Sequence, residues 1–156
     1  MTELILLPHA SRLIIGTLLD APEVAAIADD RVLTDGTDNQ PGPWVRVTQF
    51  GGRLINGGAH YWLEQTPFQV DCWGPGGNDR KIAHDLAETC RAVLAQRCRG
   101  ALSFTIGTSP VAGVVTGCEV GGITDTTDET FQPARPMSRF DGVLVAHPDP
   151  DFTSGS

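Results

Sequence analysis

Cysteine is the residue type here with the widest chemistry, because its thiolate can bind metal, attack a carbonyl or form a disulfide. The four cysteines are Cys72, Cys90, Cys98 and Cys118. No two of them have the short spacing of a zinc site. Each falls at an apolar position of an expected strand or helix, so we interpret them as buried, reduced thiols that bind no metal. Disulfides, metal ligands and a nucleophile are the alternatives that this pattern disfavours.

Two loops approach catalytic or phosphate-binding motifs without completing them. Residues 107–111 (GTSPV) lack the second glycine of a hydrolase elbow. Residues 74–77 (GPGG) precede an expected helix but lack the lysine and the hydroxyl residue that a phosphate-binding loop requires. We therefore expect a loop serine in the first segment and a strand-to-helix turn in the second.

The remaining titratable residues form no set for catalysis or metal binding. The histidines are His9, His60, His84 and His147, which lie in unrelated segments. The carboxylates at 35 and 38, and at 125, 128 and 129, do not match a calcium loop, so solvated loop charge is the expected reading. The sequence predicts no catalytic residue, no cofactor, no metal and no enzymatic activity.

The charge balance argues against a nucleic-acid-binding domain. The chain has 156 residues and a net charge of −8, and its 11 Lys and Arg residues are scattered. A DNA-binding domain needs a basic face. Charged residues make up only 19% of the chain, which leaves uncharged surface for assembly. We expect no secretory signal in the first residues and no membrane span, because no apolar stretch approaches about 20 residues.

Three helices are expected, at residues 8–19, 23–28 and from 78 or 79 to 97. In the first, Ile14 and Leu18 lie on one stripe, and Gly16 weakens the helix by up to about 1 kcal/mol. In the long helix, the apolar stripe contains Leu86, Cys90 and Val93. Pro8 begins the first helix, as proline can at a first helical position, and Pro22 stands just before the second.

Alternation of apolar and polar residues predicts strands at 31–33, 44–50, 68–73, 114–120 and 140–146. Residues 53–66 are expected to form a hairpin whose tip is at 56–58. Residues 99–112 are read as irregular and 123–138 as a polar connection. The fold class is therefore α+β: a mainly antiparallel or mixed sheet of about five strands, with the long helix and the N-terminal helix packed on it. A single domain is expected over 1–148, followed by a disordered tail at 149–156.

Three side chains are candidates for an assembly interface: Trp62, Phe131 and Arg135. Aromatic residues and arginine are enriched at binding hot spots, and Pro133 and Pro136 stiffen the segment around Arg135. The alternatives are core packing for Trp62 and a Phe131 that folds back on its own sheet. Trp44 and Trp73 flank strands and are expected to cover a sheet face.

Several segments, in this order and spacing, resemble tail terminator proteins of long-tailed phages, as found in phages of actinobacteria. They are DRV at 30–32, PWVRVT at 43–48, FQVDCWG at 68–74, RAVL at 91–94 and PARP at 133–136. The resemblance covers roughly residues 8–148, and none of its segments is a catalytic signature. The linker 33–43 and the glycine-rich tip at 56–59 depart from the family pattern, so no interface residue is carried over there.

The resemblance implies a six-fold ring that caps the tail tube at the head-proximal end of the virion. Its expected partners are copies of itself, the major tail tube protein and the head-completion or neck protein, and DNA passes through the lumen without specific binding. The chain would be made in the host cytoplasm. Two alternatives remain open: another phage neck, head-completion or tube protein, and a small ligand-binding module or enzyme.

Overall fold

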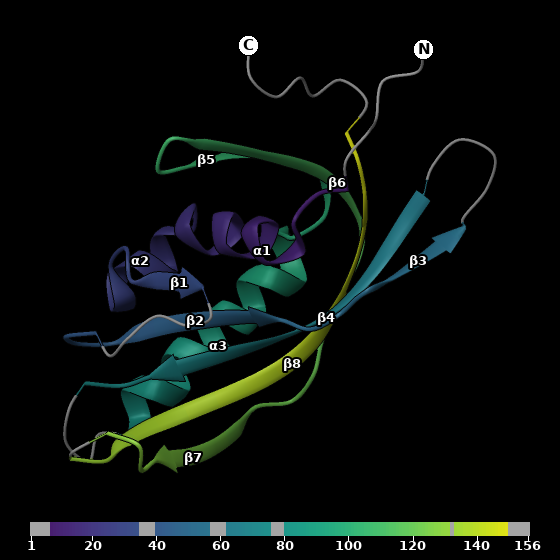
Figure 1. Cartoon of the computed structure of the whole chain (residues 1–156). Helices are drawn as coiled ribbons and strands as arrows, with labels where there is room; N and C mark the ends of the chain where they lie inside the picture. Colours follow the sequence, from purple (N-terminus) through teal and green to yellow (C-terminus); the bar gives the residue numbers. More distant parts are fainter. Residues whose placement is uncertain (1–6, 35–39, 57–61, 76–79, 132, 150–156) are drawn as a thin grey trace.

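The computed structural model describes residues 7–34, 40–56, 62–75, 80–131 and 133–149. Within them it has an α+β fold of three helices and eight strands, which confirms the predicted class (Figure 1). In chain order the elements are α1 (Ala10–Leu19), α2 (Pro22–Ala28), β1 (Val32–Thr34), β2 (Trp44–Gln49), β3 (Arg53–Asn56), β4 (Trp62–Trp73), α3 (Arg80–Arg97), β5 (Gly100–Ile106), β6 (Ser109–Val120), β7 (Thr124–Asp128) and β8 (Arg135–His147).

The eight strands form one curled, mixed sheet in the order β1-β2-β4-β8-β6-β5. Only β1 and β2 run parallel, and every other pair is antiparallel. On one side, β4 pairs with β3 along its first half and with β2 along its second half. In the same way, one side of β8 pairs first with β7 and then with β6. Between β2 and β3, three residues stand opposite two residues of β4, and between β6 and β7, three residues stand opposite two of β8. An extra residue of this kind bends the chain.

All three helices pack on one face of the sheet, here called the helix side (Figure 1). The core contains the predicted rows of β4 (Phe68, Val70, Cys72) and α3 (Leu86, Cys90, Val93), which are all buried. Val45 and Val47 of β2 join this core, as their alternation predicted. The burial phase of these three elements is therefore confirmed.

Gly16 in α1 has a packing role that its helix propensity does not reveal. A Cβ atom at this position would lie 2.4 Å from the ring of Phe104 in β5. The missing side chain lets α1 approach the sheet closely, so the unfavourable helix propensity of glycine is offset by contact with an aromatic ring.

The irregular region predicted at 99–112 was wrong, because it forms β5 and the start of β6. Leu102, Phe104 and Ile106 alternate with exposed Ala, Ser and Thr, which is the pattern of a half-buried strand. Gly107, with φ of 63°, provides the turn between the two strands. The small polar residues were read as a loop because only one side of this edge strand contacts the core.

The predicted face of residues 114–120 was also wrong in its first half. Val115 is buried against the core and Val114 is not, whereas Cys118 and Val120 pack on the core as expected. The ladder to β8 shifts register between Val115 and Gly117. This β-bulge at Thr116 inverts the alternation, so a uniform period of two cannot describe both ends of β6.

The connection predicted at 123–138 is shorter than expected, because β7 occupies its start and β8 begins at Arg135. Strand β7 is rich in threonine, a good strand former, and Pro136 stands near the first residue of β8, where proline is tolerated. The expected hairpin is confirmed by the β3–β4 pairing, while its tip at 57–58 lies outside the described residues. The same holds for the tail 150–156, the carboxylates at 35 and 38, and the helix cap at 78 or 79.

Candidate assembly surfaces

Arg135, a predicted interface residue, is only 5% exposed and is held inside the subunit. Its Nη1 donates to the carbonyl of Gln40 at 2.7 Å, and its Nη2 donates to those of Gly42 and Gly74 at 2.7 and 2.6 Å. Three backbone acceptors from two other segments thus converge on one guanidinium. Within the subunit, Arg135 fastens the start of β8 to the segments before β2 and after β4.

Phe131, the second candidate, folds back on its own sheet. It packs half-buried on a cluster with Trp44, Trp73 and Met137, and it meets the Trp73 ring edge-on at a centroid distance of 6.2 Å. The Arg135 guanidinium lies 5.9 Å from its ring centroid. This intramolecular packing was the stated alternative, and any additional role of Phe131 or Arg135 at a subunit contact stays a prediction.

The sheet face opposite the helices, here called the outer face, is covered at one end by tryptophan. Trp44 and Trp73 cover this face as expected, and their rings stack with centroids 4.1 Å apart and planes 9° from parallel. Trp73 Nε1 donates to Asp128 Oδ2 at 3.0 Å, and the Arg46 guanidinium lies 4.8 Å from the Trp73 ring centroid. This end of the outer face is a closed second core, not a free binding surface.

Asp71, next to this cluster, was not singled out by its sequence. Its side chain is fully buried and accepts from Arg46 Nη2 at 3.0 Å and from Arg139 Nε at 2.5 Å. Strands β2 and β8 flank β4 and place an arginine directly opposite Asp71 on each side. A carboxylate buried without such partners would be strongly unfavourable. The signal that could have revealed it was a charged residue inside the strongest strand pattern.

Trp62, the third candidate, is the first residue of β4 and stands opposite Asn56 of β3. Its side chain lies outside the described residues, so its interface role stays a prediction. Figure 1 shows this hairpin projecting away from the helices. Two large hydrophobic side chains are exposed at or near β3: Leu54 at 59% and Phe50 at 46%.

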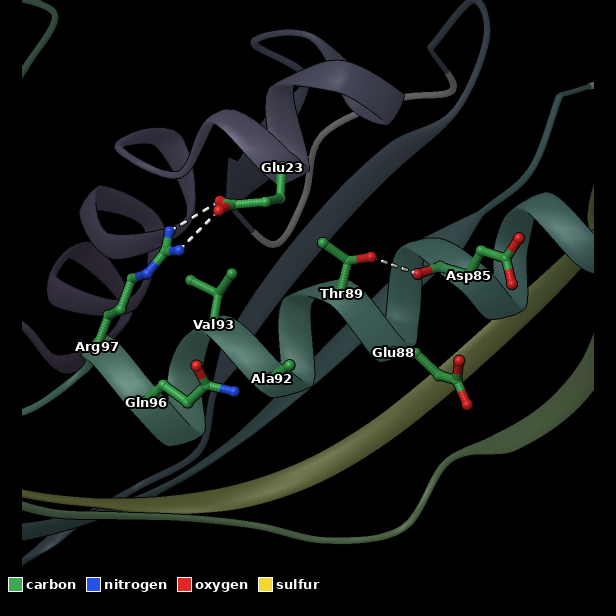
Figure 2. Close-up of a pocket in the computed structure, with 8 residues that line it drawn as sticks. All are labelled: Glu23, Asp85, Glu88, Thr89, Ala92, Val93, Gln96 and Arg97. Atoms are coloured by element: carbon green, nitrogen blue, oxygen red, sulfur yellow. Dashed lines mark hydrogen bonds and ion pairs between the residues drawn. The ribbon is translucent and has the colours of Figure 1, made fainter.

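A groove of about 520 Å³ lies between α2 and α3 (Figure 2). It is lined by Glu23, Asp85, Glu88, Thr89, Ala92, Val93, Gln96 and Arg97. Glu23 accepts two hydrogen bonds from Arg97, which lower the pKa of Glu23 to about 2, and Glu88 points away from this ion pair. Its lining holds no nucleophile beside a base. It carries three carboxylates and one guanidinium, so it offers an acidic contact surface.

His84 of α3 bridges two carboxylates at the rim of the sheet. Protonated, it donates from Nδ1 to Asp125 of β7 at 2.9 Å and from Nε2 to Glu88 at 3.1 Å. The hydrogen bond with Asp125 is the main cause of a raised His84 pKa. Hydrogen bonds from Ser138 and then from His84 lower the pKa of Asp125, and Arg80 adds a favourable charge nearby. This cluster ties α3 to β7 in a pH-dependent way.

His84→Gln is expected to destabilise the chain more in mild acid than in mild base. Because the pKa of His84 is raised in the folded chain, its contribution to stability is fully present below the ordinary histidine pKa of 6.5 and is lost as the pH rises through the folded pKa. The lowered pKa of Asp125 contributes stability that is present above pH 3.8, the ordinary pKa of aspartate. This stability is lost as the pH falls through the folded pKa. Thermal unfolding of the wild type and of His84→Gln at about pH 5.5 and about pH 8.5 checks this, because one pH lies below and the other above the usual range of histidine titration. An equal difference in melting temperature at the two pH values would contradict it.

All four thiols are free, and they form two neighbouring pairs. Cys72 and Cys90 lie in the core, where burial and then the neighbouring thiol raise the pKa of Cys72. Cys98 is buried beside the half-buried Cys118, whose pKa the Cys98 thiol raises. The predicted burial is confirmed for Cys72, Cys90 and Cys98, whereas Cys118 is only half-buried and packs against the core. The redox state and metal content of the four cysteines stay predictions.

The part of the chain that the structure describes has no cluster of three or more metal-ligating side chains. In that same part, none of the helices has the length and apolar character needed to span a membrane.

Comparison with known proteins finds similarity at the level of fold. No protein-family model matches the sequence, and no curated protein matches it. Among solved structures, the chain is similar to a chain from the virion of a native gene transfer agent particle, with a TM-score of 0.51 and 14% sequence identity. The superposition covers 88% of this chain and 92% of that chain, so the likeness extends over nearly the whole fold of both.

Proposed function

We propose that this chain is a non-enzymatic structural protein of a phage or phage-like virion. The observation that carries the proposal is its fold, which is similar over 88% of the chain to a component of a gene transfer agent virion, a phage-like particle. Shape alone does not define a function, so the surfaces must agree with it.

Three features of the described surfaces agree with an assembly role. The hairpin β3–β4 projects with an exposed Leu54, the sheet ends in open edge strands, and the α2–α3 groove is acidic. The lining of the α2–α3 groove holds no nucleophile beside a base. These features favour a protein that works through contacts with other chains.

Within this class, the specific role that we propose is that of tail terminator. Six copies form a ring on the finished tail tube, stop its polymerisation and offer a surface to the head-completion or neck protein. The sequence resemblance over residues 8–148 supports this role, as does a net charge of −8, which would limit adhesion of DNA passing through the lumen.

Deleting the gene for this chain from the genome that encodes the particle tests this role. The expected result is tails of excessive or variable length that are not joined to heads, seen by electron microscopy. Supplying the wild-type chain from a plasmid should restore normal length. Absence of all tails would point to a tube subunit, and normal tails beside unjoined heads to a neck protein. Particles of normal form would overturn the proposal altogether.

A further inference from the structure

Strand β5 forms an open end of the sheet. It pairs with β6 on one side, and no strand among the described residues pairs with its other side. The chain carries 30 charged residues (11 basic, 19 acidic), yet residues 100–118, which span β5 and most of β6, contain none. Edge strands that must stay unpaired are normally protected by charges, prolines or bulges. A seven-residue edge without a charge lacks the first of these protections.

Strand β3 provides a second open edge, at the opposite end of the sheet. Among the described residues it pairs with β4 alone, and β1 pairs with β2 without reaching β3. Its single charge, Arg53, is positive in a chain of net charge −8. Its Leu54 is 59% exposed, although it belongs to a strand of the sheet.

The apolar side chains of the two edge strands lie on the same face of the sheet. Along the ladder, Leu54 stands opposite Glu64, which stands opposite Ala146, Val115 and then Gly100. Leu54 is therefore on the same face as the half-buried row of β5, which consists of Leu102, Phe104 and Ile106. If β3 of one copy extended the sheet of another beyond β5, Leu54 would continue the apolar row on the helix side.

We propose that β3 of one copy pairs with β5 of the next, so that the sheets of neighbouring copies join head to tail. The proposal rests on the ring proposed above, because a contact between two different edges repeats and closes into a ring, whereas a contact between identical edges stops at a dimer. A second copy is the occupant because both complementary edges belong to this chain. An uncharged strand facing one that carries only Arg53 also avoids the repulsion expected between two acidic chains.

Cross-linking between single-cysteine additions tests the pairing. Thr105→Cys and Arg53→Cys each place an exposed thiol on the outer-face row of its edge. A short bismaleimide should link a mixture of the two variant chains into dimers, because each chain has one added thiol and can form one link. Either variant alone should link no more than the wild-type chain, which measures the background of Cys118.

Leu54→Asp supplies the independent variant. It should abolish the cross-link of the mixture and weaken self-association more than tenfold in analytical ultracentrifugation. Ala95→Asp, an exposed change of the same charge on α3, should leave both unchanged. Equal melting temperatures of the two variants at low concentration would exclude misfolding as the cause.

Three results would overturn this pairing. The first is a Thr105→Cys chain that links to a second copy of itself, which indicates a symmetric β5–β5 contact. The second is a mixture of the two variants that does not link. The third is a wild-type chain that stays monomeric at the highest concentration reached. None of them depends on tail length. Overlong tails in the deletion strain would therefore still support the terminator role if the pairing failed, and a confirmed pairing could stand without that role.

Discussion

Arg135→Met is expected to lower the free energy of unfolding by about 3–5 kcal/mol, because it removes the donor to three buried carbonyl groups. Each buried acceptor left without a partner costs about 1–3 kcal/mol. The acceptors are the carbonyls of Gln40, Gly42 and Gly74. Methionine fills a similar volume, so the loss would come from hydrogen bonds more than from a cavity. Chemical denaturation followed by tryptophan fluorescence measures it, since Trp44 and Trp73 lie in the adjoining cluster.

Two further variants define the origin of that loss. Arg135→Lys keeps the charge but not the planar fork, so it should recover only part of the stability. Arg99→Met changes an exposed arginine whose Nε reaches a carbonyl within its own turn, and should alter stability by less than about 0.5 kcal/mol. An Arg135→Met chain as stable as the wild type would mean that water replaces the guanidinium at little cost.

Leu86→Ala is the second large effect, with an expected loss of about 2–5 kcal/mol, the range for leucine truncation in a packed core. Leu86 of α3 is fully buried and belongs to the core cluster that joins the helices to the sheet. Part of the loss is the transfer energy of the removed atoms, and part is the cavity that the neighbours fail to fill. Urea denaturation with the slope held common to both chains gives the difference.

Gln96→Ala is the matched control, because it lies exposed on the same helix, and its effect should stay below about 0.5 kcal/mol. If Leu86→Ala also stayed within this limit, the helix side of the sheet would not be the principal core.

These expectations change how the predicted interface residues are to be tested. Phe131 and Arg135 are held within the subunit, so their alanine variants combine loss of folding stability with any loss of assembly. A leucine at 54 is exposed in the subunit and can be changed without that confusion. The projecting hairpin, which also contains Trp62, is therefore the sharper place to separate assembly from folding.

Local patterns predicted the fold class, the three helices and the strands at the centre of the sheet. Phe68, Val70 and Leu86 could be placed because burial repeats along a strand or a helix with a period that neighbouring residues reveal. The absence of a catalytic motif likewise follows from residue types and spacing. The resemblance to tail terminators adds a role that periodicity alone does not contain.

The tertiary structure decided the edges of the sheet and the partners of the polar residues. Strand β5 was missed because an edge strand buries only one side, and the face of Val114 was misjudged because a bulge shifts the register. The carbonyls that hold Arg135 lie 61 to 95 residues away along the chain, and His84 meets Asp125 across 41. Such contacts depend on which strands become neighbours, and the order of strands in a sheet is set by the packing of the whole chain rather than by any local run of residues.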